Sequence, residues 1–280
     1  MTRLGAHVSI ADGVQHAPQR GADLGCTAIQ IFTRNQRQWR AKPLTEQEIT
    51  QFKINLKEQG FTPPAICAHD SYLINLAAPD PSLLSKSREA FADELHRAEI
   101  LGIPCVVFHP GAHKGHGETA GLKRIAESLD YVYDKFPQTS VLALLETTSG
   151  QGTTLGYRFE QLQQIIEMVA IPQKIGICLD TCHIFAAGYD IRTESAYLNT
   201  FEQFDRILGL SKLKVIHLND SKKAFGSRVD RHENIGKGMI GLDAFRFIMH
   251  DDRLNGIPKI LETPGGDEWY TINLDILRKL

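Results

Sequence analysis

Side chains that can bind a metal ion stand at the ends of apolar segments throughout this 280-residue chain. Six such segments run directly into His69, His109, Glu146, Asp180, His217 and Glu262. The three further candidates are His183, Asp230 and His232. Histidines and carboxylates without thiolates suit zinc, and also manganese or iron. These residues predict a metal site, and they are too many for a single ion.

The number of ligands also indicates the chemistry. A catalytic zinc ion usually takes three protein ligands and keeps one position open. The candidates, with one bridging carboxylate, supply enough bonds for three ions, and Glu146, in the middle of the series, is a suitable bridge. Clustered divalent ions stabilise the attacking and leaving oxygens of a phosphoryl displacement, and they lower the pKa of bound water. We therefore expect phosphate ester hydrolysis, with Glu146, Asp180 and Glu262 as the catalytic carboxylates.

The cost of burial separates ligands from ordinary core residues. Glu146 and Glu262 each follow an apolar run, and a buried carboxylate is costly without a cation. A lone histidine at a strand end is more often a hydrogen-bonded core residue, so we expect His7 to be structural or to support a ligand. The remaining histidines fall in helices or polar loops and are expected to face solvent: His16, His96, His113, His116 and His250.

Strand-like apolar runs alternate with helical segments along the chain. The runs cover residues 4–9, 28–33, 65–70, 105–110, 141–147, 176–183, 214–220 and 259–263. The helical segments cover residues 45–59, 80–102, 118–135, 159–169 and 193–208. The clearest helix begins after Asp80, a capping residue followed by proline, places Leu84, Phe91 and Leu95 on one face, and stops at Gly102.

This alternation predicts an α/β fold. Buried parallel strands read as continuous apolar runs, and eight of them alternating with helices favour a (β/α)8 TIM barrel. The metal site is then expected at the C-terminal face of the strands, where such barrels place their catalytic residues. The alternative is an open doubly wound sheet, which calls for a glycine-rich phosphate loop after the first strand. The segment from Gly5 to Val8 has no such form.

Length and composition suit a single catalytic domain over residues 1–280, because barrels of roughly 250 residues are commonly one domain. No apolar run approaches the roughly 18 residues that a bilayer crossing needs, and the N-terminal segment lacks the features of a secretory signal. The cysteines are odd in number and scattered, so we expect reduced core residues of a cytoplasmic protein. Cys182, between two candidate ligands, is expected to pack in the core.

The net charge of −2 does not exclude a nucleic-acid partner. Four of the 33 acidic residues are proposed metal ligands, which leaves 31 − 29 = +2 over the rest of the chain. Bound divalent ions add positive charge where the substrate would meet the protein. The charge therefore neither supports nor opposes binding to DNA.

Three polar loops on the expected catalytic face indicate the substrate. Residues 33–40 hold three arginines with amides and an indole, residues 69–75 follow the third strand, and lysines and arginines surround Asp230 and His232. Arginine and amide side chains contact phosphates and base edges, and aromatic or apolar wedges enter a base stack. DNA is therefore a candidate substrate. The expected contacts are Asn35, Arg37, Gln38, Tyr72, Leu73, Arg228 and Arg231.

Three long motifs give the chain a resemblance to a known family. They are HDSYLINLA from His69, GICLDTCH from Gly176, and HLNDSK from His217, the last continuing through GSRVDRH to Asn234. With these motifs in the same order, the chain resembles the endonuclease IV family of zinc-dependent apurinic/apyrimidinic endonucleases over nearly its whole length. The resemblance implies a TIM barrel with three zinc ions, manganese being possible at one site. It also implies hydrolysis of the phosphodiester on the 5′ side of an abasic site in duplex DNA, and removal of blocking groups from 3′ ends.

Residue by residue, the resemblance implies one zinc ion at His69, His109 and bridging Glu146. It implies a second at Glu146, Asp180, His217 and Glu262, and a third at His183, Asp230 and His232. Arg37, Tyr72 and Leu73 would enter the duplex and hold the abasic nucleotide outside the helix.

The chain departs from the family at Thr147, where the family has asparagine, and this puts only a supporting or substrate contact in doubt. The competing hypothesis is a metal-dependent sugar isomerase or epimerase on a similar barrel. Such an enzyme has no need of a third metal group or of an arginine-rich loop. Nothing in the sequence requires more than a monomer.

Overall fold

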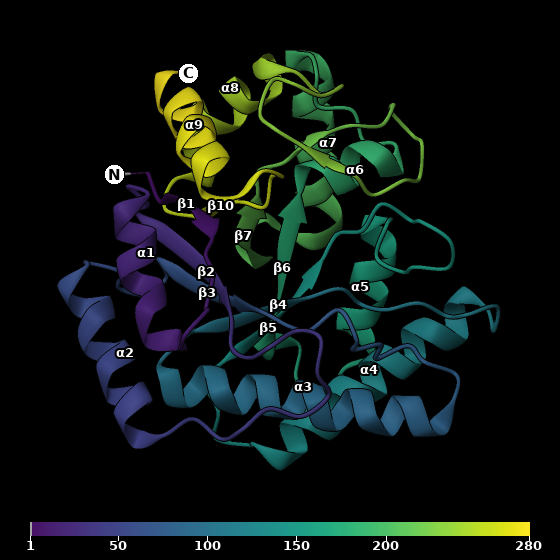
Figure 1. Cartoon of the computed structure of the whole chain (residues 1–280). Coiled ribbons are helices and arrows are strands. Elements are labelled where there is room, and N and C mark those ends of the chain that lie inside the picture. The colour runs from purple at the N-terminus through teal and green to yellow at the C-terminus, as the bar shows by residue number, and fades with distance from the viewer. Residues whose placement is uncertain (1) are drawn as a thin grey trace.

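The computed structural model describes residues 2–280, and its central element is a closed barrel of parallel strands surrounded by helices (Figure 1). The barrel strands are β1 (Leu4–His7), β2 (Ala28–Phe32), β3 (Ile66–His69), β4 (Cys105–Phe108), β5 (Leu142–Glu146), β6 (Ile175–Asp180), β7 (Leu213–His217) and β10 (Lys259–Leu261). They follow one another around the barrel in sequence order, and β10 closes it by pairing with β1. The predicted TIM barrel is confirmed.

The helices cover the outside of the barrel. They are α1 (Ala17–Asp23), α2 (Glu46–Glu58), α3 (Pro81–Leu101), α4 (Glu118–Lys135), α5 (Phe159–Met168), α6 (Thr181–Ala187), α7 (Glu194–Leu208), α8 (Leu242–His250) and α9 (Gly266–Lys279). The five predicted helices correspond to α2, α3, α4, α5 and α7. In α3, the Asp80 side chain accepts a hydrogen bond from the Leu83 N–H, and Gly102 ends the helix with a φ of 76°. Phe91 and Leu95 are fully buried, as their spacing predicts.

The predicted strand over residues 176–183 is wrong at its C-terminal end. The strand β6 stops at Asp180, and residues 181–183 form the first turn of α6. The reason is that the Asp180 side chain accepts a hydrogen bond from the His183 N–H, which caps a new helix at this position. The apolar character of the segment continues through the helix because α6 is buried, so the run itself gave no boundary.

The apolar core has two parts. A larger cluster fills the space between the strands and the helices, and a smaller one fills the inside of the barrel. Cys67, Cys105 and Cys178 belong to the inner cluster, and all five cysteines are buried and unpaired. This agrees with their predicted role as reduced core residues. Among residues 2–280, no helix is both long and apolar enough to cross a membrane.

Strand register brings the ends of the strands to one rim of the barrel. Phe32 pairs with His69 across β2 and β3, and Asp180 pairs with His217 across β6 and β7. Side chains at the C-terminal ends of the strands, and those just after them, therefore meet at the same opening of the barrel. Beyond β7 the chain forms a hairpin of β8 (Asp220–Ser221) and β9 (His232–Glu233), which returns to this rim.

Candidate metal centre

The structure brings the predicted metal ligands into three neighbouring groups, two of which share Glu146. Their possible ligand atoms lie within 4.8 Å of one another in each group. The groups are His69, His109 and Glu146; Glu146, Asp180, His217 and Glu262; and His183, Asp230 and His232. Four ligands are the last residues of β3, β5, β6 and β7, and His109 and Glu262 follow the ends of β4 and β10 directly.

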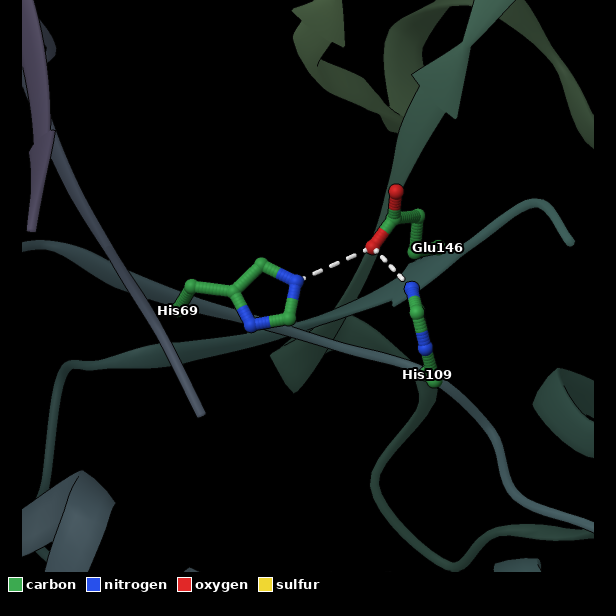
Figure 2. Close-up of side chains that lie close together, drawn as sticks. All are labelled: His69, His109 and Glu146. Carbon is green, nitrogen blue, oxygen red and sulfur yellow. Dashed lines mark hydrogen bonds and ion pairs between the residues drawn. The ribbon is translucent and has the colours of Figure 1, made fainter. Parts of the chain in front are cut away.

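Glu146 lies at the centre of the arrangement. Figure 2 shows that one carboxylate oxygen, Oε2, faces both His69 Nε2 and His109 Nε2, each at 3.1 Å. The other oxygen, Oε1, points away from this pair and lies 3.0 Å from His217 Nδ1. The side chain is fully buried at the end of β5. Glu146 thus turns one oxygen to each of two groups, which is the geometry that a bridging carboxylate needs.

The second group gathers around His217. Its Nδ1 atom lies 3.3 Å from Glu262 Oε2 and 3.9 Å from Asp180 Oδ2. The third group is more open: His183 Nε2 lies 3.1 Å from Asp230 Oδ2, and His232 Nε2 lies 3.5 Å from Asp230 Oδ1. His183 Nε2 and His232 Nε2 are buried atoms without a hydrogen-bond partner among the described residues. Unpartnered nitrogens facing carboxylates fit the donor set of a metal ion.

Hydrogen bonds fix which nitrogen of each histidine faces the centre. The Nδ1 atoms of His69, His183 and His232 lie 2.9, 2.8 and 3.2 Å from the backbone carbonyl oxygens of residues 70, 147 and 262. A carbonyl oxygen can only accept, so each of these nitrogens carries the proton and donates it. In the neutral rings that a metal requires, the Nε2 lone pairs then face the carboxylates. Ligand histidines in proteins are commonly oriented in this way.

Thr147, the departure from the family motif, supports two ligands. Its hydroxyl accepts a hydrogen bond from the Asp180 N–H at 2.9 Å, and its carbonyl oxygen accepts from His183 Nδ1. Asn219 acts similarly: its amide donates to Asp180 Oδ2 at 2.6 Å, and its Oδ1 accepts from the Glu262 N–H at 2.8 Å. Both residues are buried. They hold ligands in place. The sequence had marked position 147 as a supporting or substrate contact, whereas Asn219 was not singled out.

Electrostatics couple the histidines to the carboxylates. Burial alone raises the pKa of Glu146 and lowers the pKa of His69, because it penalises the charged form of either side chain. For Glu146, the adjacent His109 and His217 outweigh this effect and hold its pKa well below the ordinary range. For His69, the hydrogen bond and charge of Glu146 raise the pKa to about 10. Without a metal ion, the raised pKa values of His69, His183 and His217 keep protons on these rings, which offset the buried carboxylates, so metal binding must displace the protons.

The loop that carries Asp230 and His232 is held by a buried carboxylate. Asp220 accepts hydrogen bonds from the backbone N–H groups of Gly236 and Gly238, both at 3.0 Å, and of Ile240 at 2.9 Å. A Cβ atom on Gly238 would lie 2.4 Å from a backbone oxygen, so only glycine fits there. Asp220 was read from the sequence only as part of a strand.

Half-buried His7 and buried Gln30 contact the candidate ligands without belonging to a metal-binding group. The His7 Nδ1 atom lies 3.0 Å from Glu262 Oε1, and His7 belongs to none of the metal-binding groups, which agrees with the supporting role expected for it. Gln30, in the middle of β2, contacts both Glu262 and His217 and was missed from the sequence. The only feature of the sequence that could have indicated this role is that Gln30 is a polar amide inside an apolar run.

The solvent-exposed histidines and Cys182 largely follow their predictions. His16, His96, His116 and His250 are exposed, but His113 is half-buried and its Nδ1 accepts a hydrogen bond from the Gly117 N–H. The Cys182 sulfur lies within 4.8 Å of possible ligand atoms of Asp180 and His232. It is fully buried, and burial raises the pKa of its thiol to about 12, so the thiolate that a metal needs is disfavoured.

The candidate DNA contacts surround the metal centre. Asn35, Arg37 and Gln38 are exposed on the loop after β2, and Tyr72 is 64% exposed on the loop after β3. The Ser71 hydroxyl donates to the Gln36 carbonyl at 2.6 Å and joins the two loops. The remaining candidates are half-buried Leu73, exposed Arg231, and exposed Arg228, whose guanidinium lies 4.1 Å from the centre of the Tyr157 ring.

A buried ion pair anchors the loop after β2. Arg34 Nε donates to Glu94 Oε1 of α3 at 2.6 Å, and Arg34 Nη1 donates to the Trp39 carbonyl at 2.9 Å. The Thr33 hydroxyl donates to the second oxygen of Glu94. The exposed side chains of the loop therefore project from a rigid base.

Cavities open on two sides of the metal centre. One, of about 690 Å³, is lined by Asn35, Tyr72, His232, Glu262 and residues of the first turn of α9, among others. The other, of about 220 Å³, is lined by His109, His183, Asp230 and Arg231, together with residues of the loop after β5. Arg37 and Gln38 line neither cavity and lie on the outer surface. The metal centre is thus accessible along a path that runs across the barrel opening.

Comparison with known proteins places the chain. The family model described as xylose isomerase-like TIM barrel matches residues 18–280. A probable endonuclease 4 from Geotalea daltonii is 52% identical and covers 99% of this chain and 97% of its own length. A probable endonuclease 4 from Chloroflexus aurantiacus is 50% identical and covers 100% of this chain and 98% of its own length.

Solved structures agree with this placement. Endonuclease IV from Thermus thermophilus superimposes with a TM-score of 0.88 and 36% identity, and covers 99% of this chain and 98% of its own. A D-tagatose 3-epimerase-like protein covers 100% of this chain and 96% of its own with a TM-score of 0.74, but at 17% identity it shows only a shared fold. The chain belongs to the xylose isomerase-like TIM barrel family and, within it, to the endonuclease IV proteins.

Proposed function

We propose that this protein is a DNA repair endonuclease that hydrolyses the phosphodiester on the 5′ side of an abasic site in duplex DNA. The products are a 3′-hydroxyl and a 5′-deoxyribose phosphate, and blocked 3′ ends are a second substrate. The observation that carries the proposal is the metal centre: Glu146 faces two ligand groups, and a third group lies beside them. About half of the sequence is identical to endonuclease 4 proteins over the full chain, which supports the same activity.

The donor sets suit three zinc ions, with manganese as an alternative at one of them. Nitrogen and carboxylate oxygen are the ligands of catalytic zinc, and the two groups of three residues would each leave the fourth tetrahedral position for a further ligand. When bound, such ions supply Lewis acidity to the phosphate and make water more acidic. The residues of the chain position the metal ligands. Glu146 belongs to two of the groups, buried Thr147 holds the backbone of Asp180, and buried Asn219 holds its carboxylate.

The exposed loops are proposed to hold the DNA. Arg37, Tyr72 and Leu73 would enter the duplex at the lesion, and Asn35, Gln38, Arg228 and Arg231 would contact its backbone. Tyr72 is suited to this role because its ring is largely exposed beside the metal centre. An abasic sugar displaced from the helix would then reach Glu262 through the larger cavity.

Incision of a duplex with one tetrahydrofuran abasic analogue, in buffer without added magnesium, tests the proposal. The analogue lacks the aldehyde that β-elimination requires, so only a hydrolase can cut it. We expect a cut on the 5′ side that leaves a 3′-hydroxyl which a polymerase extends. The undamaged duplex is the control and should stay intact. No incision by fully metallated protein would contradict the proposal.

Glu262→Gln tests the role of this carboxylate. It removes a charged ligand at the edge of the larger cavity while leaving the exposed DNA loops unchanged. We expect turnover to fall by orders of magnitude while binding to abasic DNA stays close to that of the parent. Binding is measured by fluorescence anisotropy in parallel with single-turnover incision. Parental turnover in this variant would show that Glu262 is not catalytic.

A sugar isomerase or epimerase is the competing function, since proteins of that class share the fold. It is disfavoured because the structures of that class are no more than 18% identical to this chain. Metal content separates the two functions: we expect about three ions per chain for the endonuclease and one or two for the isomerase. A monomeric state and a cytoplasmic location are further proposals, which gel filtration and cell fractionation can test.

A further inference from the structure

Gln30 is a polar residue in an apolar environment. Its side chain is fully buried inside the barrel, next to the inner cluster that contains Cys67. Burial of an amide is costly unless its hydrogen-bonding groups find partners. Gln30 has such partners in two proposed metal ligands, at 2.6 Å from Glu262 Oε1 and 2.8 Å from His217 Nε2.

We infer that Gln30 is a positioning residue that selects the metal-binding nitrogen of His217 and orients the carboxylate of Glu262. The inference rests on the proposed metal centre and adds a residue to it. Gln30 is not itself a metal ligand, so any effect on metal binding passes through these two neighbours, either directly or through His7, whose Nδ1 lies 3.0 Å from both the Gln30 amide nitrogen and Glu262 Oε1.

The chemistry of the partners fixes the orientation of the amide. A carboxylate oxygen only accepts hydrogen bonds, so the amide group facing Glu262 Oε1 at 2.6 Å must be the NH₂ group. The carbonyl oxygen of Gln30 then faces His217 Nε2 and can only accept from it. The proton of His217 therefore sits on Nε2, and the Nδ1 lone pair faces Glu146, Asp180 and Glu262.

His217 differs in this respect from three other ligand histidines. His69, His183 and His232 donate Nδ1–H to backbone carbonyl oxygens and present Nε2 to the centre. His217 presents Nδ1, and its Nε2–H is held by a side chain. Backbone carbonyls cannot be removed by substitution, but the Gln30 carbonyl can. The support of His217 is therefore open to a direct test.

Gln30→Met tests the inference because methionine has a similar size and makes neither hydrogen bond. The purified, zinc-loaded variant and parent are titrated with a zinc chelator, and the metal remaining per chain is measured. Loss of an outer hydrogen-bond partner typically weakens metal binding about 10–100-fold. We expect one of three ions to leave at chelator concentrations lower by that factor, and the other two to leave as in the parent.

Ile31→Val is the matched control. Ile31 is fully buried in the same strand but packs in the outer cluster, between the barrel and the helices. It should lower the stability of the fold and leave the chelator titration unchanged. A titration of Gln30→Met that superimposes on the parent would overturn the inference, as would equal weakening of all three ions. A parent chain that binds no zinc would overturn the proposed function and this inference together.

A measurement on the unmodified protein keeps the inference testable if Gln30→Met does not fold. In the zinc-loaded parent with ¹⁵N-labelled histidine, NMR spectra distinguish metal-bound from protonated ring nitrogens. We expect His217 to show a metal-bound Nδ1 and a protonated Nε2, and His69, His183 and His232 to show the reverse. Coordination of His217 through Nε2 would contradict the role assigned to Gln30.

Discussion

Glu94 and Glu146 are both buried carboxylates, but their surroundings differ. Glu94, on α3, receives hydrogen bonds from Arg34 and Thr33, so its charge is balanced within the protein. Glu146, at the end of β5, is surrounded by histidines and lies near Asp180 and Glu262. If its histidines are neutral, this region has a surplus of negative charge, and buried nitrogens there have no partner among residues 2–280.

The difference indicates which buried charges serve the fold and which serve function. The two charges of a buried ion pair cancel, even though one nitrogen of Arg34 (Nη2) has no hydrogen-bond partner among the described residues, and breaking such a pair mainly costs stability. A buried cluster with surplus carboxylates and free donor atoms is complete only with a cation or with extra protons. The Arg34–Glu94 pair is therefore structural, and the cluster around Glu146 is the region that should respond to metal and pH.

Metal removal should have the largest effect on activity, and it should act only on the cluster around Glu146. Exhaustive chelation is expected to lower incision by several orders of magnitude, because the carboxylates and histidines cannot replace a divalent cation. It should also lower the melting temperature, because ions that bind the folded chain stabilise it relative to the unfolded chain. Zinc release should be faster at pH 6 than at pH 8, because the raised pKa of His69 lets protons compete for its nitrogen.

Restoration of activity by added zinc is the control for metal removal. Far-UV circular dichroism should show that the chelated protein keeps its secondary structure. Full activity in chelated protein with no residual metal, measured by mass spectrometry, would contradict the division between the two regions.

Arg34→Met should disrupt the structural ion pair between Arg34 and Glu94. It leaves Glu94 buried without its cation, which typically costs about 3–5 kcal/mol of folding stability. It also releases the Trp39 carbonyl, so the loop after β2 should loosen and binding to DNA should weaken. Stability is measured by urea unfolding, and zinc content should stay at the parental value because no metal ligand is touched.

The double variant Arg34→Met/Glu94→Met is the matched control. It removes both charges, so most of the lost stability should return. The double variant should still bind DNA weakly, since the contact to Trp39 remains absent. If the double variant is less stable than Arg34→Met alone, Glu94 is not the source of the cost.

A third buried ionisable group, Lys259, extends the comparison between Glu94 and Glu146, and its expected effect on stability is smaller. Lys259, at the start of β10, is 2% exposed, and its ammonium group donates to the Leu254 carbonyl. Burial lowers the pKa of Lys259 from 10.5 to about 8, with only a partial offset from Asp251. The unfolded chain therefore holds this proton over a pH range in which the folded chain has lost it. Stability should rise with pH between about 8 and 10.5.

Lys259→Met should remove this rise. Between pH 8 and pH 9 the parent is expected to gain about 1 kcal/mol of unfolding free energy relative to the variant. Urea unfolding of both proteins at matched pH values measures the difference, in which other titrating groups cancel. A constant difference across this range would show that the lysine has an ordinary pKa.

The repeating pattern of the sequence was sufficient to predict the barrel. Apolar runs of strand length alternate with amphipathic segments. Each barrel strand is buried on both faces, and such a strand appears in the sequence as a continuous apolar run. The helix over residues 118–135 has its predicted bounds, while α1, α6, α8 and α9 were missed. In α6 the burial of the whole helix hid its period.

The candidate metal ligands could also be predicted from a local feature of the sequence. A histidine or carboxylate at the end of an apolar run stands out, because burial of such a group needs a partner. Gln30, Asn219 and Asp220 carry the same physical signal more weakly, since a buried amide or a hydrogen-bonded carboxylate is common in any core. Their roles depend on which ligands they face, and that is a property of the assembled barrel.

The sequence by itself determined the fold class and the kinds of residue at the metal centre, because strand periodicity and the cost of buried charge are local properties. Only the tertiary structure decided which oxygen of Glu146 faces which group, and which nitrogen of His217 faces the centre. These choices follow from strand register and from hydrogen bonds between residues far apart in the chain. Gln30 and Glu262, separated by 232 positions, meet only when β10 closes the barrel against β1 and β2.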